Sequence, residues 1–181
     1  MYIADGWKDY EVIDTGDGEK LERWGNVILR RPDPQTIWPE QQKNLWFKAD
    51  AVYHRSQKGG GEWEFFDLPQ NWLLHYKELT FRLQPFAFKH TGVFPEQAVN
   101  WDWFSGIIRD ARKSNPDYQP KVLNLFAYSG GATLAAAAIG KEMGLLSDNF
   151  FNAIIILSIV TTLPIPSLVR LVLSCNKKSC E

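Results

Sequence analysis

One stretch, residues 121–138, constrains the fold more than any other part of the chain. Residues 122–128 are almost all apolar, which is typical of a strand buried on both faces of a parallel sheet. Residues 129–131 read Ser-Gly-Gly and predict a turn, since glycine takes positive φ without strain, and the Ala-rich residues 133–138 form helix readily. Together they predict the first βα unit of a doubly wound, Rossmann-like sheet. The same pattern also fits a turn that only packs a helix against a strand.

Two sequence motifs carry a resemblance. The segment Asn124-Leu-Phe-Ala-Tyr-Ser-Gly-Gly-Ala-Thr133, preceded by Thr91-Gly-Val-Phe-Pro-Glu-Gln97, resembles class I S-adenosylmethionine-dependent methyltransferases related to those that methylate bases of large-subunit ribosomal RNA. The resemblance runs from about residue 10 to about residue 138, and it implies S-adenosylmethionine (SAM) as cofactor and RNA as substrate. Carried over position by position, it implies cofactor-binding roles for Thr91, Phe94, Gln97, Asn124, Phe126, Tyr128, Ser129, Gly130, Gly131 and Thr133.

The resemblance also implies how each motif would act. In the family, the glycine turn and the start of the following helix present N–H groups to the methionine end of SAM. The first position of that motif is often acidic, whereas Asn124 carries no charge. The segment 91–97 lies over the cofactor in the relatives, which implies a packing surface at Phe94 and a polar contact at Gln97. Gln97 is also compatible with a helix start on a solvent-exposed face, and both interpretations stay open.

After residue 138 the expected pattern stops. A second buried strand ending in an acidic residue should follow; Asp148 lies at about the right distance, but Ser147-Asp148 indicates a helix start instead. The groups that would hold a substrate come from later strands that the sequence lacks, so no catalytic residue can be named. We therefore expect a truncated methyltransferase without turnover and with a weak half-site for SAM. Alternatives are a non-enzymatic binding module and a membrane-tethered chimeric product.

The C-terminal end has a different character. Residues 150–169 form a run of 20 residues without a charge, which meets the length of a membrane span. A shorter resemblance, over 144–173, is to the last helix of monovalent cation–proton antiporters. A buried strand or helix of the same domain fits the run equally well, and it would fold back to cover the strand at 122–128. We therefore expect an end of unrelated origin, with membrane contact through 150–169 left open.

The N-terminal part has the pattern of β structure broken by turns. Strands are expected over 10–13, over 21–29 in two pieces split at 25–26, and in two hairpins, 51–54 with 62–66 and 72–76 with 79–83. Helical spacing of apolar residues over 97–113, with Pro95 just ahead, predicts an amphipathic helix. The expected fold class is α+β to α/β, in three parts: a β-rich module over 1–86, the start of the methyltransferase domain over 87–139, and a hydrophobic segment over 140–181.

The amino-acid composition restricts which partners the chain could bind. The 20 basic and 21 acidic side chains give a net charge of −1, so RNA binding would need a local patch. Most of the eight Trp residues are expected in the sheet and a minority could stack on bases. Cys175 and Cys180 suggest no disulfide or metal framework, and reduced thiols in the cytoplasm are expected. His54 and His75 are expected to be ordinary hydrogen-bonded residues, no metal site is expected, and the oligomeric state has no sequence signal.

Overall fold

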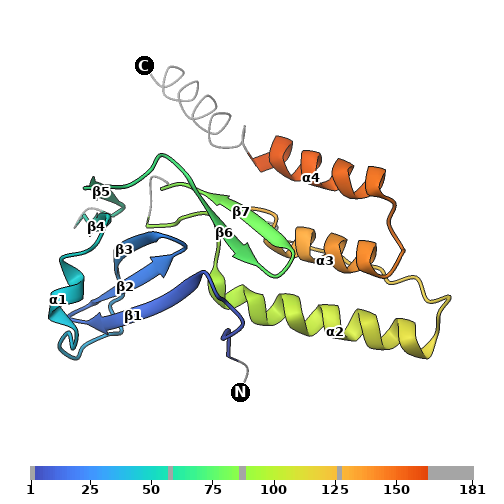
Figure 1. Ribbon diagram of the computed structural model, residues 1–181, viewed down its shortest axis with the longest axis horizontal. Coiled ribbons are helices and arrows are strands. Elements are labelled where there is room, and N and C mark those ends of the chain that lie inside the picture. Colours follow the sequence, from blue (N-terminus) through green and yellow to red (C-terminus); the bar gives the residue numbers. More distant parts are fainter. Residues whose placement is uncertain (1–2, 57–58, 86–88, 126–127, 163–181) are drawn as a thin grey trace, which may run out of the picture. The chain divides into compact units, whose positions relative to one another are not determined.

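The computed structural model describes residues 3–56, 59–85, 89–125 and 128–162. The chain divides into two compact units, Met1–Val99 and Asn100–Glu181 (Figure 1). The described strands all belong to the first unit, and helices α3, Gly131–Glu142, and α4, Asp148–Thr162, belong to the second. Mixed α and β structure with a β-rich N-terminal part was the predicted class, and it is confirmed.

The N-terminal unit contains a five-stranded sheet in the order β1-β2-β3-β4-β5. Its strands are β1 Tyr10–Gly16, β2 Glu19–Trp24, β3 Val27–Pro32, β4 Ala51–Arg55 and β5 Gly61–Phe65. Neighbouring strands are antiparallel except β3 and β4, which are parallel. Tight turns set this order: Asp17 and Gly18 take positive φ between β1 and β2, and Gly25 does so between β2 and β3. These strands confirm the predicted ones.

A separate two-stranded sheet pairs β6 Trp72–Tyr76 with β7 Leu79–Leu83. Lys77 takes a φ of 51° in the turn between them. On β7 the buried Phe81 and Leu83 alternate with the exposed Thr80 and Arg82, which is the predicted period of two. This second hairpin is therefore confirmed.

The crossover between the parallel strands β3 and β4 carries the short helix α1, Lys43–Trp46. The Asp14 carboxylate, at a register shift in β1, accepts hydrogen bonds from the Trp46 indole (2.8 Å) and from the Gln41 and Gln42 N–H groups (3.0 and 2.8 Å). These bonds fix α1 against one face of the sheet. There Trp46 packs with Leu21 and Val52 in a buried apolar cluster.

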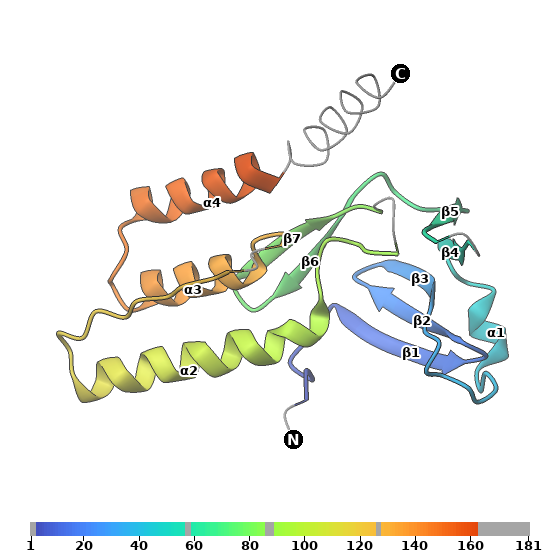
Figure 2. The ribbon, with the colours of Figure 1, turned by 180° about the vertical axis from the view of Figure 1, so that it is seen from behind.

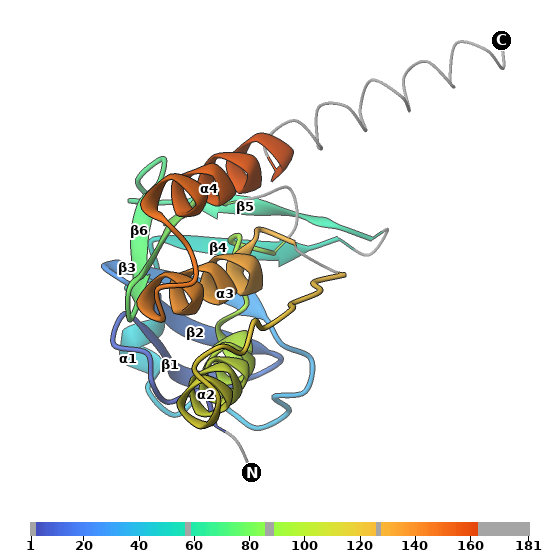
Figure 3. The same ribbon diagram turned by 90° about the vertical axis from the view of Figure 1, so that its right-hand side faces the viewer.

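The C-terminal unit is helical throughout its described secondary structure. α2 spans Ala98–Ser114 and enters this unit at its third residue, α3 spans Gly131–Glu142, and α4 spans Asp148–Thr162. In all three views α3 lies between α2 and α4 (Figures 1, 2 and 3). Arg109 of α2 donates two hydrogen bonds to Glu142 of α3, at 2.9 and 2.7 Å. On α2 Trp101 and Ile108 are buried, as the predicted amphipathic helix requires.

The buried strand predicted over 122–128 is wrong. Residues 122–125 and 128 form no strand, and the side chains of Val122, Leu123 and Leu125 are 57%, 82% and 73% exposed. The physical reason is that a strand exists only when a neighbour accepts and donates its ladder hydrogen bonds. The described residues of the C-terminal unit offer no such neighbour. The βα unit is therefore present only as its turn and its helix.

The C-terminal apolar run begins as the helix α4. Its Ile154 lines the same cavity as Val122, but Leu123 and Leu125 remain exposed, so the described part of the run does not cover the segment as expected. Within residues 3–162, apart from the gaps given above, no helix combines the length and apolarity needed to cross a bilayer. The remaining part of the predicted span, residues 163–169, lies outside the described residues, as do Cys175 and Cys180.

Candidate functional site

The predicted cofactor turn lies at the start of α3. Tyr128 and Gly130 both adopt left-handed backbone, with φ of 49° and 86°, and Gly130 is the residue that precedes the first turn of the helix. Because Gly130 has no side chain to accept the first N–H groups, these groups are left to water or to a ligand. The Tyr128 side chain is 50% exposed and Ser129 is half-buried beside it. The turn thus provides outward-pointing donors at the positive end of a 12-residue helix.

Gly131 has a packing role in the structure, and its cofactor contact stays a prediction. A Cβ atom at this position would lie 2.9 Å from Cζ2 of Trp101, which is closer than real Cβ contacts. The indole of α2 therefore occupies the space that a side chain at Gly131 would need. At this position the glycine serves helix packing, which is the alternative reading of the glycine turn, while Gly130 is the position where the turn itself requires positive φ.

Asn124 and Thr133 come together although eight residues separate them. The Asn124 side-chain amide donates to the Thr133 hydroxyl at 2.9 Å, so the two ends of the motif are tied to each other. Both residues line a cavity of about 410 Å³ whose other walls are apolar, formed by residues such as Ile108, Ile139 and Leu146. This lining offers no charge to the ammonium, carboxylate or sulfonium group of SAM. The cavity is therefore a poor site for the methionine end, and the turn is the better candidate.

The other predicted motif, residues 91–97, lies in the N-terminal unit. Thr91 is 1% exposed, and its hydroxyl has no hydrogen-bond partner among the described residues. Phe94 packs edge-on against the His90 ring, with 5.3 Å between the centroids. Gln97 ends the short 3-10 helix η1, Pro95–Gln97, and its backbone N–H donates to the Phe94 carbonyl at 3.0 Å. Gln97 is exposed at this helix start, which leaves both interpretations of it standing.

Side chains from other parts of the N-terminal unit hold this segment at two points. The Trp7 indole donates to the Pro95 carbonyl at 2.9 Å. The Arg31 guanidinium donates to the Lys89 carbonyl at 2.7 Å, and the Lys89 ammonium donates back to the Pro32 carbonyl at 3.3 Å. The backbone on either side of Thr91 is thus fixed to the sheet and to the N-terminal segment.

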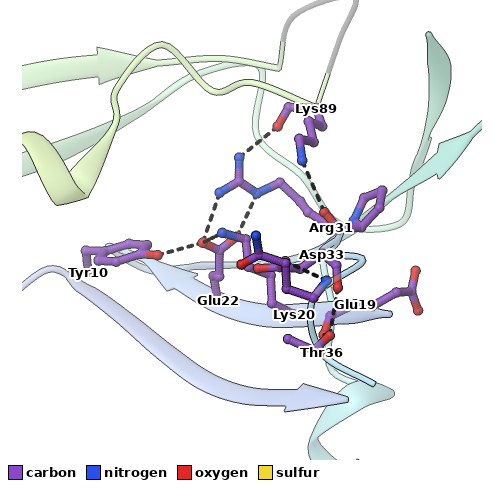
Figure 4. Close-up of polar contacts among 10 residues, drawn as sticks. Tyr10, Glu19, Lys20, Glu22, Arg31, Asp33, Thr36 and Lys89 are labelled. Carbon is purple, nitrogen blue, oxygen red and sulfur yellow. Dashed lines mark hydrogen bonds and ion pairs between the residues drawn. The ribbon is translucent and has the colours of Figure 1, made fainter. Parts of the chain in front are cut away.

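A buried ion pair orients the Arg31 side chain. Arg31 donates from Nε and Nη2 to the two oxygens of Glu22, at 2.6 and 2.9 Å, while its Nη1 points to Lys89 (Figure 4). The Glu22 carboxylate also accepts from the Tyr10 hydroxyl at 2.6 Å and lies 3.2 Å from the Lys20 ammonium. The Arg31 guanidinium further lies over the Trp24 ring, 5.0 Å from its centroid. Every contact that an ionised Glu22 needs is therefore supplied.

This network sets three protonation states. Although burial opposes ionisation, the charge and hydrogen bonds of Arg31 hold the pKa of Glu22 below its usual value. Burial raises the pKa of the Tyr10 phenol far above its usual value, and the neighbouring Glu22 charge adds to that rise. Burial lowers the pKa of His90, as do the positive charges of Arg31 and Lys89. At neutral pH the network therefore combines an ionised Glu22 with a neutral Tyr10 and a neutral His90.

The predicted site residues thus fall into two groups. Asn124, Tyr128, Ser129, Gly130, Gly131 and Thr133 lie in the C-terminal unit, and Thr91, Phe94 and Gln97 lie in the N-terminal unit. Phe126 lies outside the described residues. His54 and His75 are hydrogen-bonded to Glu64 and Asp9, both at 2.7 Å, as predicted for ordinary residues.

The sequence reasoning missed the Glu22–Arg31 pair. A usable signal was present. Glu22 and Trp24 are two residues apart on one strand, so their side chains point to the same face of the sheet, and the register across the 25–26 turn places Arg31 of the adjacent strand on that face as well. Opposite charges at inward positions of two such strands indicate a buried pair.

The comparisons with known proteins point in one direction. No protein-family model and no curated protein matches the chain. Among solved structures, the chain is similar to the SAM-dependent methyltransferase from Agrobacterium tumefaciens, with 39% sequence identity and a TM-score of 0.67 over 75% of this chain and 42% of that one. It also matches a putative SAM-dependent methyltransferase from Streptococcus mutans, at 15% identity and a TM-score of 0.46 over 75% of this chain and 37% of that one.

The chain spans less than half the length of either relative. The predicted cofactor, SAM, agrees with the SAM dependence of the Agrobacterium tumefaciens protein, and neither neighbour is described as acting on ribosomal RNA or as an antiporter. Those two finer resemblances stay predictions. Over three quarters of its length, the chain is therefore similar in both sequence and fold to a SAM-dependent methyltransferase.

Proposed function

We propose that this chain carries the start of a SAM-dependent RNA methyltransferase and binds the methionine end of SAM at residues 128–133. The observation that carries the proposal is the 39% identity and TM-score of 0.67 to the methyltransferase from Agrobacterium tumefaciens. The left-handed backbone of Tyr128 and Gly130 at the start of α3 supports the position of the site. SAM, when bound, supplies the methyl group that is transferred from its sulfonium.

In that function, this chain binds SAM and orients it. The first N–H groups of α3 suit a carboxylate, because they are unpaired within the helix and the helix dipole is positive there. The Asn124–Thr133 hydrogen bond holds the segment before the turn against the helix after it. Residues 91–97, fixed by Trp7 and Arg31, are the second candidate surface toward SAM.

We further propose that the chain alone binds SAM weakly and does not turn over. A helix N-terminus contributes only about 0.3–1 kcal/mol to binding a charge when it is exposed. Before the turn, residues 122–125 form no strand, and Val122, Leu123 and Leu125 are largely exposed, so these residues add little rigidity. We expect a dissociation constant on the order of 1 mM or weaker. The RNA substrate, a ribosomal base by resemblance, belongs to the same proposal.

Amide NMR shifts test the cofactor site directly, since they detect weak binding. Titration with SAM, and separately with methionine, should shift the amides of residues 129–133, because both ligands carry the carboxylate. Adenosine should leave these amides unchanged, and the first turn of α4 at Asn149 and Phe150 is the internal control for a second helix start. Shifts elsewhere only, or none at millimolar SAM, would overturn the site. Repeated turnover in a methyl-transfer assay on RNA would overturn the proposed inactivity.

A further inference from the structure

The N-terminal unit has a second cavity that the proposed cofactor site does not use. It measures about 400 Å³ and lies on the face of the sheet that carries α1, with walls from β2, β3, β4 and β5. Two phenylalanine rings line it and are open to solvent, Phe47 at 91% and Phe66 at 60% exposed. Single exposed apolar side chains are common, but two rings beside one cavity indicate a surface that covers a flat apolar partner.

The polar wall of this cavity is held in place by the fold. The Arg30 guanidinium lies 5.2 Å from the centroid of the buried Trp46 ring and donates from Nε to Glu19 at 2.6 Å. On the neighbouring strands His54 Nε2 is 2.7 Å from Oε2 of Glu64. Among the described residues, one oxygen of each carboxylate has a partner, and the other oxygen can accept a hydrogen bond from a ligand. The cavity therefore combines aromatic faces with acceptors that suit an N–H donor.

One cation next to the cavity lining in sequence faces solvent. Lys48 follows Phe47, and its side chain is exposed. It forms no ion pair with any other described residue. Arg55 is also exposed, but it alternates with His54 on β4 and therefore lies on the opposite face of the strand. Lys48 is thus the cation that can contact a phosphate next to a bound base.

We propose that this cavity binds an unpaired base of single-stranded RNA, with Phe47 and Phe66 as the stacking surfaces. A base offers the flat face that the rings need, and its phosphate matches Lys48. Glu64 selects bases that carry an exocyclic amino group, because a carboxylate accepts from N–H donors such as N4 of cytosine. Cytosine is therefore preferred over uracil, which presents a carbonyl oxygen at that position. The choice of RNA rests on the proposed function, while binding here requires no SAM.

Fluorescence anisotropy with labelled oligocytidine and oligouridine of eight nucleotides, without SAM, tests the site on the full chain. Oligocytidine should bind more tightly, and Phe47→Ala and Phe66→Ala should each weaken it roughly five-fold to a hundred-fold. Phe65→Ala is the matched control, because Phe65 is 56% exposed on the opposite face of β5 and should have no effect. Glu64→Gln should reduce the preference for cytosine. One phosphate contact, at Lys48, predicts a slope of log K against log salt of about −0.7.

Several results would overturn this assignment. If neither oligonucleotide binds, or if Phe47→Ala and Phe65→Ala weaken binding equally, there is no base site in this cavity. If RNA fails to bind while Phe47→Ala abolishes concentration-dependent self-association in sedimentation, the face is a protein contact instead. A failure of SAM binding or methyl transfer leaves these outcomes unaffected, because no step of the assay uses the cofactor.

Discussion

Replacing Arg31 by methionine tests whether the buried pair organises the N-terminal unit. The Glu22 side chain is 0% exposed and that of Arg31 is 9% exposed, so the pair lies out of contact with water. Arg31→Met removes both hydrogen bonds to Glu22 and the one to the Lys89 carbonyl. Loss of one partner of a buried pair typically costs about 3–5 kcal/mol. We expect about 3 kcal/mol, since the Tyr10 hydroxyl and the Lys20 ammonium still stabilise the carboxylate.

Urea denaturation at pH 7, followed by intrinsic fluorescence and circular dichroism, measures this loss. Glu11→Gln is the matched control on the same sheet, because Glu11 is 60% exposed and pairs with Arg23 at 3.2 Å. An exposed pair contributes about 0–1 kcal/mol. The double variant Glu22→Leu with Arg31→Met should lose less stability than Arg31→Met alone, since no charge then stays buried without a partner.

Two results would refute this reasoning. A loss below about 1 kcal/mol in Arg31→Met would mean that water reaches the Glu22 carboxylate and that the pair is not buried in solution. A double variant whose loss equals the sum of the two single losses would mean that Glu22 and Arg31 act independently.

Three further predictions follow from the same contacts. Because the folded-state pKa of Glu22 lies below its ordinary value of 4.5, the stability that ionised Glu22 contributes is present above pH 4.5 and is lost as pH falls through the lowered pKa. Urea midpoints measured between pH 7 and pH 3 should therefore fall less steeply in Glu22→Gln than in the parent. Some decrease remains in this variant, because the pKa values of Asp9 and Asp14 are also lowered. Gly131→Ala should lower stability by about 1–3 kcal/mol in thermal melts through its contact with Trp101, and adding Trp101→Phe should recover part of the loss; equal melting of Gly131→Ala and the parent would contradict that packing. Thr133→Val should cost about 0.5–1.5 kcal/mol in the same melts by removing the acceptor of the Asn124 amide, and no change would mean that this bond is absent in solution.

Local signals in the sequence predicted most of the N-terminal fold. The β2–β3 hairpin follows from Gly25 at its turn, and the β6–β7 hairpin follows from two alternating runs around Lys77, so neighbours along the chain contain the information. The helix α2 was predicted for the same reason, since its period is visible within 17 residues. These elements depend on contacts that are short in sequence.

The strand over 122–128 failed for the opposite reason. Apolar composition favours a buried strand, but the strand forms only where another segment supplies hydrogen-bond partners, and composition carries no information on that segment. Gly131 shows the same limit, because glycine is required at this position by the contact with Trp101, thirty positions earlier. The candidate turn was located correctly at the start of α3, whereas the reason for its second glycine required the contact itself.

The two units therefore differ in how completely their polar groups are paired and their apolar side chains are buried. In the N-terminal unit a buried carboxylate has its full set of donors, and the cavity beside Phe47 has walls fixed by the hydrogen bonds of Arg30 and His54. In the C-terminal unit the turn has positive φ and open N–H groups, yet the apolar side chains leading into it stay exposed at Leu123 and Leu125. A site whose supporting backbone is unpaired must spend ligand binding energy on ordering that backbone, which lowers affinity. We therefore predict that RNA binding and SAM binding are separable in this chain, and that RNA binding is measurable where SAM binding is weak.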